Sequence, residues 1–558
     1  MGLSDRLSNT DAGSLAMLTG VKIVALLIFA GLLYYWRPVV HPFAYLARYS
    51  AVGMIVIGST TAVALLLYLA PPLRDETSGD PSPVTKAQLL GAWFIIVLVI
   101  GVVVGMAGGV YQGAVHAEQT MDRADEVETL PAMDVDHPRI TPRKVADKQT
   151  RGSVSYRKYQ LGASDIMRGD NGSLVWSYAT EPEGLRNSIV EEQDGVVTAD
   201  LTTMDDREIR TVRVDMKYGM GMTIGSTNDS FLENRDVRWK LLKSDYWTTY
   251  QDDVRPFIHD GQPYLYFPKT TYNVNWLPVP HRTVEWDGGA LVHADGTIEQ
   301  LSSEAARNHP VLEGQPLFPY ANTKERLGDI GYREGIVNAW IEHENQVERA
   351  DMPAGAGNEQ PFVVDLEERP ISYVTALEPY GDDTRALDEV WFTNSRTGKF
   401  TVYSSGEKNL IGPERAVAIA RSTDTNTNWG ENFRIVEPVP VVIDGELWWH
   451  MKVVPSDSTA VSRNIFVHGN ADDGRTAVLY SGGQTSLTSM RHSRLLVAQR
   501  DRHQPMVSTL NMSLLSATRM ARSSTRSLLG ATRQSVSTVP HRLETQRSSG
   551  NTRPGGRI

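Results

Sequence analysis

The first 111 residues contain three long apolar stretches, and the chain after them has a different pattern. The stretches run from about 15 to 36, 51 to 70 and 89 to 111. Each is close to the roughly 20 residues that a helix needs to cross a bilayer core of about 30 Å. A backbone in hydrocarbon must satisfy its own hydrogen bonds, so we predict three transmembrane helices and a membrane anchor over residues 1–113. A cleaved signal peptide fits the first stretch less well, because no small-residue cleavage site precedes Arg37 and Pro38.

Charged residues around the three stretches predict the orientation of the chain. With the N-terminus inside the cell, four cations face the cytoplasm and three lie on the opposite side. The four are Arg6, Lys22, Arg74 and Lys86, and the three are Arg37, Arg48 and Arg123. Because cytoplasmic flanks are richer in Lys and Arg, we expect the large domain that follows to lie outside the cytoplasm.

The third stretch contains Gly101, Gly105 and Gly109, which form two overlapping G-x-x-x-G steps on one helix face. Small residues at this spacing allow two helices to approach closely. Two interpretations follow: packing within the three-helix anchor, or self-association of the chain into a homo-oligomer.

Residues 114–140 are polar and acidic and are interpreted as a juxtamembrane linker. From 141 to 486 the chain alternates short β-rich runs with Asp-Gly and Asn-Gly pairs, which are favoured in tight hairpins. The pattern is clearest over 413–480. It predicts a helix that begins at Pro413, strands over 433–443 and 447–454 joined by Asp444-Gly445, and two further strands near 465–467 and 476–479.

Similar hairpin signals recur earlier in the chain. They lie at Asn171-Gly172, Asp260-Gly261, Asp295-Gly296 and Thr397-Gly398, each beside an apolar run. We therefore predict an α+β body of repeated antiparallel units over about 141–212, 250–300, 365–405 and 413–480.

The order of an Ala-rich helix, an Asp-Gly hairpin with an aromatic strand and a closing strand pair resembles the PepSY-like module. The resemblance is clearest over 413–480, partial over 255–300 and 371–403, and faint over 140–212. It implies an exported, non-catalytic domain that binds or restrains peptides and peptidases.

Composition excludes several kinds of chemistry. The 558 residues include no cysteine, which excludes disulfides, iron–sulfur clusters, thiolate zinc sites and a thiol nucleophile. The net charge of −11 conceals a basic tail at 487–558, which holds twelve Arg and no Lys. We interpret this Ser- and Arg-rich tail as disordered. It is a non-functional or frame-shifted product, a linker, or a binding arm, and we do not expect a nucleic-acid partner.

Motifs that would indicate catalysis or metal binding are incomplete. His343-Glu344-Asn345 lacks the second histidine of H-E-x-x-H, so we interpret it as a polar helix face. The pairs Asp252-Asp253 and Asp382-Asp383 are interpreted as solvated loops, and Gly219–Met222 as a strand. No catalytic, cofactor-binding or metal-binding residue is therefore expected.

Seven aromatic residues lie within about thirty positions, and they indicate either a strand core or a ligand or partner surface. They are Tyr246, Trp247, Tyr250, Tyr264, Tyr266, Tyr272 and Trp276. Asn171, Asn228 and Asn511 begin glycosylation sequons, which chance alone would explain in a chain of this length.

Together these patterns predict a multi-pass protein of the cell membrane whose exported body binds a protein or peptide partner without catalysis. Two other functions stay open: a peptidase regulator or an enzyme with an unrecognised site, and a viral or plasmid-encoded envelope component.

Overall fold

The computed structural model describes residues 4–480 except for fifteen short segments. These segments are 70–85, 133–138, 154–157, 185–186, 188–190, 203–207, 218–235, 251–253, 356, 368, 382–385, 407, 444, 459 and 471–475. The predicted tail at 487–558, the two Asp pairs, the 219–222 segment and the sequons at Asn228 and Asn511 lie outside the described residues.

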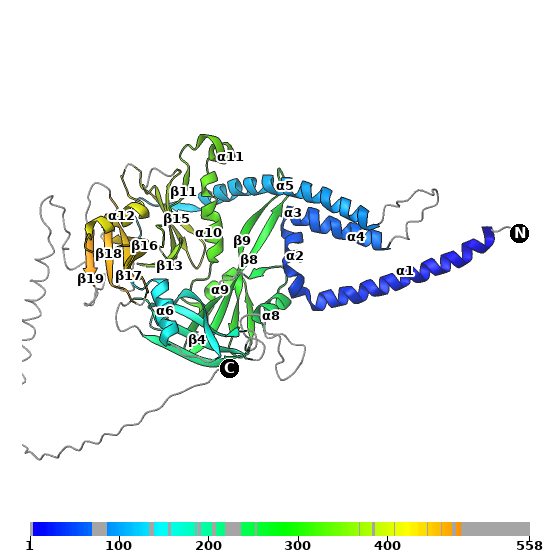
Figure 1. The fold of residues 1–558 in the computed structure, drawn as a ribbon, viewed down its shortest axis with the longest axis horizontal. Helices are drawn as coiled ribbons and strands as arrows, with labels where there is room; N and C mark the ends of the chain where they lie inside the picture. The colour runs from blue at the N-terminus through cyan, green and yellow to red at the C-terminus, as the bar shows by residue number, and fades with distance from the viewer. Residues whose placement is uncertain are drawn as a thin grey trace, which may run out of the picture. The chain divides into compact units, whose positions relative to one another are not determined.

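Three segments of the described chain form helices long and apolar enough to span a membrane, as predicted (Figure 1). They are Met17–Tyr35, Ala51–Leu69 and Ala87–Asp122. The first belongs to α1 (Ser4–Tyr35) and the third to α5 (Lys86–Asp122). The second consists of α3 (Ala51–Gly53), a π-helical turn η1 (Met54–Gly58) and α4 (Ser59–Leu69).

A further helix that the sequence analysis did not predict, α2 (Arg37–Tyr49), connects the first two spans. One side of α2 is buried against the body through His41 and Tyr45. The opposite side exposes Val39, Phe43 and Leu46, which recur at helical spacing. The helix is therefore amphipathic. Its apolar side is exposed, whereas the apolar side of a helix usually faces the protein core.

The last turns of α5 belong to the body, although the sequence predicts a linker from residue 114. His116, Ala117 and Thr120 are fully buried there. Immediately after the helix, β1 (Ala124–Glu126) pairs in parallel with β15 (Phe400–Ser404). The third span is thus joined to the body by a continuous helix and a strand.

The described part of the body contains four β-sheets, and nearly all of their strand pairs are antiparallel, which confirms the predicted α+β class. The first sheet follows α6 (Arg143–Ser153) and has the order β2-β3-β4-β5. Its strands are β2 (Tyr159–Arg168), β3 (Leu174–Pro182), β4 (Gln193–Asp200) and β5 (Ile209–Met216).

The second sheet is built around the long hairpin of β8 (Gln262–Asn275) and β9 (His281–His293). It follows α8 (Val237–Ser244), and its order is β10-β9-β8-β6, with β7 also paired to β8. The shorter strands are β6 (Thr249–Tyr250), β7 (Arg255–His259) and β10 (Ile298–Leu301).

Short helices separate this sheet from the third one. They are α9 (Ser303–Asn308), η2 (Pro310–Leu312), α10 (Tyr320–Gly328), η3 (Ile330–Tyr332), α11 (Gly335–Val337) and η4 (Asn338–Glu342). The third sheet has the order β1-β15-β14-β13-β11, with β12 paired to β13. Its remaining strands are β11 (Val347–Arg349), β12 (Phe362–Leu366), β13 (Arg369–Pro379) and β14 (Glu389–Asn394).

The fourth sheet reproduces the element order predicted for 413–480. Helix α12 (Pro413–Thr423) precedes strands in the order β16-β17-β18-β19. The strands are β16 (Phe433–Ile443), β17 (Glu446–Pro455), β18 (Arg463–His468) and β19 (Thr476–Tyr480). The hairpins predicted at 171–172, 260–261, 295–296 and 397–398 are also present, between β2 and β3, β7 and β8, β9 and β10, and β14 and β15.

Shared hydrophobic cores hold neighbouring sheets together. The largest joins the third sheet to α12 and the fourth sheet, with Trp449 at 0% exposure in it. Others join the first sheet to the third and the first to the second. A smaller core packs Leu327 and Ile330 of the α10–η3 region against Trp391 and Phe400 of the third sheet. The α10 segment therefore packs between α5 and two sheets, and a cavity lies beside it.

Candidate functional site

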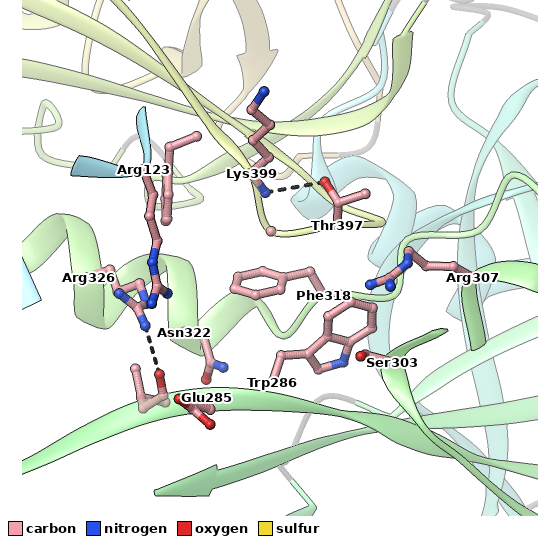
Figure 2. A pocket seen from close by; sticks show the side chains of 13 residues that line it. Arg123, Glu285, Trp286, Ser303, Arg307, Phe318, Asn322, Arg326, Thr397 and Lys399 are labelled. Atoms are coloured by element: carbon pink, nitrogen blue, oxygen red, sulfur yellow. Dashed lines mark hydrogen bonds between the residues drawn. The ribbon is translucent and has the colours of Figure 1, made fainter. Parts of the chain in front are cut away.

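A cavity of about 430 Å³ lies where α10 meets β9, the β14–β15 turn and the residue after α5 (Figure 2). Its wall combines positive and aromatic side chains. The lining residues are Arg123, Val284, Glu285, Trp286, Ser303, Arg307, Phe318, Asn322, Arg326, Thr397, Gly398, Lys399 and Phe400.

Arg326 is the most buried cation of this cavity, with 6% of its surface exposed. Its Nη2 donates a hydrogen bond of 2.8 Å to the carbonyl oxygen of Val284. Its Nη1 has no hydrogen-bond partner among the described residues. Burial lowers the pKa of the guanidinium, and the positive charge of Arg123 lowers it further. A buried charged donor without an acceptor is costly, so this position favours an anionic ligand.

Arg123 and Arg307 bring further positive charge to the same wall. The Arg123 side chain extends from the loop after α5 toward Arg326 (Figure 2). Arg307, from the last turn of α9, lies 5.7 Å from the ring centre of Trp286. Against these three cations stands one lining carboxylate, Glu285. The lining residues therefore carry a net positive charge, although the carboxylates of Glu325 and Asp329 also act on Arg326.

Lys399 lines the cavity but does not contribute its charge directly. Its ammonium group points away from the cavity in Figure 2, and Nζ lies 2.5 Å from Oδ2 of Asp125 in β1. Its backbone N–H donates instead to the Thr397 hydroxyl, which shapes the β14–β15 turn.

Trp286 and Phe318 form the apolar part of the wall. Their rings meet edge to face with centroids 5.8 Å apart. Gly398 comes close to Phe318, at a φ of +73°, and a Cβ there would collide with the Phe318 ring. Glycine at this turn position thus lets the hairpin approach the aromatic wall.

The geometry is suited to binding an oxyanion. Guanidinium groups match the planar geometry of carboxylates and the oxygens of phosphates. No histidine lines the cavity, and the described residues contain no cluster of three or more acidic or histidine side chains that could hold a metal ion. The only lining hydroxyls belong to Ser303 and Thr397, and neither has a histidine beside it in the wall.

A second cavity, of about 580 Å³, lies beside η3 and β11 and has the opposite character. Glu348, Asp351 and Glu359 line it, with Arg349 as the cation. Nearby, burial raises the pKa of Glu378 to about 7. The two cavities therefore differ in charge, and only the first presents a buried donor without a partner.

The glycines predicted for helix packing have different surroundings in the structure. A Cβ on Gly101 would meet Val56, and one on Gly105 would meet Val52, so both face the second span. Gly109 has nothing within 4 Å of a built Cβ. The first two lie at a helix–helix contact within the chain, whereas Gly109 faces open space.

The prediction of a helix face at 343–345 is wrong, because these residues form the turn that ends η4. His343 has a left-handed φ of 56° and Asn345 one of 49°. The ring of His343 stacks on Tyr380 with centroids 4.4 Å apart. The turn therefore places the His343 ring against Tyr380, and His343 is not part of a helix face.

The seven clustered aromatic residues divide between core and surface. Tyr266 is fully buried, whereas Trp247 and Trp276 are exposed. Tyr246 contacts His41 of α2, and Tyr272 contacts Tyr45 of the same helix. The strand-core interpretation therefore holds for Tyr266, and a ligand or partner surface stays a prediction. Asn171, the sequon within the described residues, is exposed in the β2–β3 turn.

The arginine cavity has no counterpart among the sites predicted from the sequence. Arg123 and Arg326 are separated by about two hundred residues, and no local motif surrounds either one. Contacts between α5 and the α10 region, such as that of His116 with Asp329, bring them to the same wall, together with the pairing of β1 and β15. A scan against protein-family models finds no match for this chain, and a search of curated proteins finds none.

Proposed function

We propose that the chain is a membrane-anchored, non-catalytic protein of the cell envelope whose exported body binds an acidic segment of a protein or peptide partner. The single observation that supports this proposal most is Arg326, a buried guanidinium with an unpartnered Nη1 beside Arg123. A carboxylate would supply the missing acceptor and neutralise two adjacent positive charges.

The distance from the membrane favours a peptide over a lipid headgroup. The apolar stretch of α5 ends near Tyr111, and Arg123 follows twelve residues later. At a rise of 1.5 Å per residue, this places Arg123 about 18 Å beyond the apolar stretch. Trp286 and Phe318 supply an apolar wall that suits a side chain beside the carboxylate.

The arrangement of helix ends supports an exported body. The end of α1, all of α2 and the end of α5 contact the body, through bonds such as Arg37 to the Lys243 carbonyl and His116 to Asp329. Arg37, Arg48 and Arg123 therefore lie on the side of the body. Lys22 donates to the Tyr68 carbonyl, at the far end of α4. By their sequence positions Arg6, Arg74 and Lys86 belong with Lys22 on the opposite side, which the positive-inside rule assigns to the cytoplasm.

The proposal predicts that Arg123→Gln weakens binding of a fluorescent peptide that ends in glutamate. A charge-assisted hydrogen bond contributes about 1.5–3 kcal/mol, so we expect a loss of roughly tenfold or more in affinity. The measurement is fluorescence anisotropy with the full chain in lipid nanodiscs. Arg421→Gln, at an exposed position in the last turn of α12, is the matched control and should bind as the unaltered chain does.

Two further probes separate the ligand classes. The same peptide ending in glutamine amide should not bind, because it offers no carboxylate. Inorganic phosphate should compete only weakly, because it cannot use the aromatic wall. Equal binding of the glutamate and glutamine peptides, or no difference between Arg123→Gln and Arg421→Gln, would refute the proposal.

The other functions drawn from the sequence, a peptidase regulator and a viral or plasmid-encoded envelope component, stay predictions. No contact among the described residues bears on either of them.

A further inference from the structure

The tip of the β8–β9 hairpin is apolar and uncovered. The last strand pair joins Asn275 to His281, which leaves Trp276, Leu277, Pro278, Val279 and Pro280 as the connecting loop. Leu277 is 83% exposed and Trp276 is 46% exposed. Consecutive exposed apolar residues are unusual on a surface that faces water.

Contacts along α5 fix the direction in which this tip points. The backbone N–H of Val284 lies 3.3 Å from Nε2 of His116. The ring of His281 meets that of Tyr111 at 5.0 Å. Closer to the tip, the Pro280 carbonyl lies so near to Gly108 that a Cβ there would collide with it. As β9 approaches the tip, its partners on α5 move steadily toward the membrane.

Gly108 lies within the third apolar stretch, which runs to about residue 111. The loop residues Trp276 and Leu277 precede Pro280 and lie farther along the same direction. They therefore reach at least the level of Gly108, about one helical turn inside the apolar stretch. At this depth the surroundings are the headgroup and upper acyl region of a bilayer.

Helix α2 presents apolar side chains at the same end of the spans. It is covalently held between the first and second spans, and its exposed residues are Val39, Phe43 and Leu46. Its Tyr45 hydroxyl donates a bond of 3.4 Å to the Thr270 carbonyl of β8. An amphipathic helix in this position lies in the membrane surface with its apolar side toward lipid.

Cations stacked on aromatic rings surround these apolar residues, as expected at the headgroup level. Arg48 lies 4.5 Å from the ring centre of Trp247, and Lys243 lies 4.3 Å from that of Tyr35. Arg282, next to the hairpin loop, lies 4.1 Å from that of Tyr272.

We propose that the body is seated on the bilayer through a lipid-contacting surface formed by Trp276 and Leu277 of the hairpin tip and by Val39, Phe43 and Leu46 of α2. The partner is the lipid of the same membrane that the three helices span. The loop chemistry suits this place, because Pro278 and Pro280 have no N–H group that would need an acceptor in hydrocarbon. This inference is independent of the arginine cavity and of the ligand proposed for it.

The chain has no cysteine, so single labels test the proposal directly. Leu277→Cys, labelled with an environment-sensitive nitrobenzoxadiazole dye, is reconstituted as the full chain in phosphatidylcholine vesicles. Met106→Cys, exposed on α5 within the apolar stretch, is the lipid reference. Ser422→Cys, exposed on α12, is the matched aqueous control.

We expect phosphatidylcholine with brominated chains to quench the dye at position 277 as it does at position 106. Iodide in the buffer should quench the dye at position 277 severalfold less than the dye at position 422. Iodide quenching as strong as at position 422 would overturn the proposal. Protection from both iodide and bromine would also overturn it, because a second copy of the chain would then cover the tip.

Discussion

At the scale of single residues, the fourth sheet contains a buried cluster of charged side chains, and none of them lines the arginine cavity. Glu437 lies at a β-bulge between Val436 and Val439 and has a left-handed φ of 46°. This conformation turns its carboxylate to Arg139, at 2.8 Å, and to the backbone N–H of Arg143, at 2.9 Å. The strained residue thus ties the segment before α6 to the last sheet.

Lys452 lies in the same cluster and is fully buried, and its Nζ has no hydrogen-bond partner among the described residues. Burial lowers its pKa to about 7, and the charge of Arg139 also lowers it, while Glu437 raises it. Between this pKa and the ordinary value of 10.5, the unfolded chain binds a proton that the folded chain does not. The free energy of unfolding should therefore rise as the pH rises from about 7 toward 10.5.

Lys452→Met should remove this cost and raise the free energy of unfolding at neutral pH by about 1–4 kcal/mol, as replacements of buried charges by apolar side chains often do. The advantage should shrink as the pH rises toward 10.5, above which neither the folded nor the unfolded form of the unaltered chain binds the proton. Thermal unfolding of the full chain in detergent at several pH values measures both effects.

Lys148→Met provides the control for Lys452→Met, because Lys148 is an exposed lysine in α6. Lys148→Met should leave the pH dependence of the free energy of unfolding unchanged. A midpoint for Lys452→Met below that of the unaltered chain at neutral pH would contradict the assignment of Lys452 as an unfavourable buried cation.

At the scale of elements, α5 shows where a local pattern predicts correctly and where it does not. Its apolar part has no charged residue, and the sequence predicts that part as a span. The segment after Tyr111 is polar, and the sequence predicts a linker from residue 114. The helix continues because Gln112 reaches Glu325 of α10 and His116 reaches Asp329 just after α10, contacts that no local pattern can reveal.

The contacts of the glycines in α5 predict which of them tolerates a larger side chain. Gly105→Leu should force the second span away, because its Cβ would meet Val52, and overpacking costs about 1–3 kcal/mol. Gly109→Leu adds its side chain to open space and is the matched control on the same helix. Thermal unfolding in detergent should show a lower midpoint for Gly105→Leu alone.

The oligomeric state of the same two variants separates the two interpretations of the G-x-x-x-G pattern. If the glycines serve packing within the chain, the Gly109→Leu variant keeps the mass of the unaltered protein in light scattering. A smaller mass for Gly109→Leu, with an unchanged unfolding midpoint, would instead establish self-association through this face.

At the scale of the whole molecule, the orientation in the membrane predicts which cysteines a reagent can reach. In intact cells that express the full chain, Ser422→Cys should react with a membrane-impermeant maleimide, because we expect the body to be exported. Ser78→Cys, between the second and third spans, should react only after lysis. The reverse pattern would place the body in the cytoplasm and remove the support that the PepSY-like resemblance gives to an exported binding domain.

The hairpins over much of the body could be predicted from the sequence for a physical reason. Asp-Gly and Asn-Gly pairs tolerate positive φ, so they mark hairpins wherever apolar runs flank them. Gly172, Gly261, Gly296 and Gly398 all have positive φ in the structure. The predicted elements at 413–480 match for the same reason, since each strand is bounded by its own turn signals.

The three apolar stretches long enough to span a membrane, the α+β class and most hairpins are predictable, because each depends on residues within a few positions of one another. Three other features appear only in the folded chain: Arg123 and Arg326 share a wall, α5 enters the body, and the β8–β9 tip reaches the level of Gly108. Those features depend on contacts between residues that are tens to hundreds of positions apart. Such contacts arise from the packing of whole elements, and the burial of Arg326 and the exposure of Leu277 are consequences of that packing.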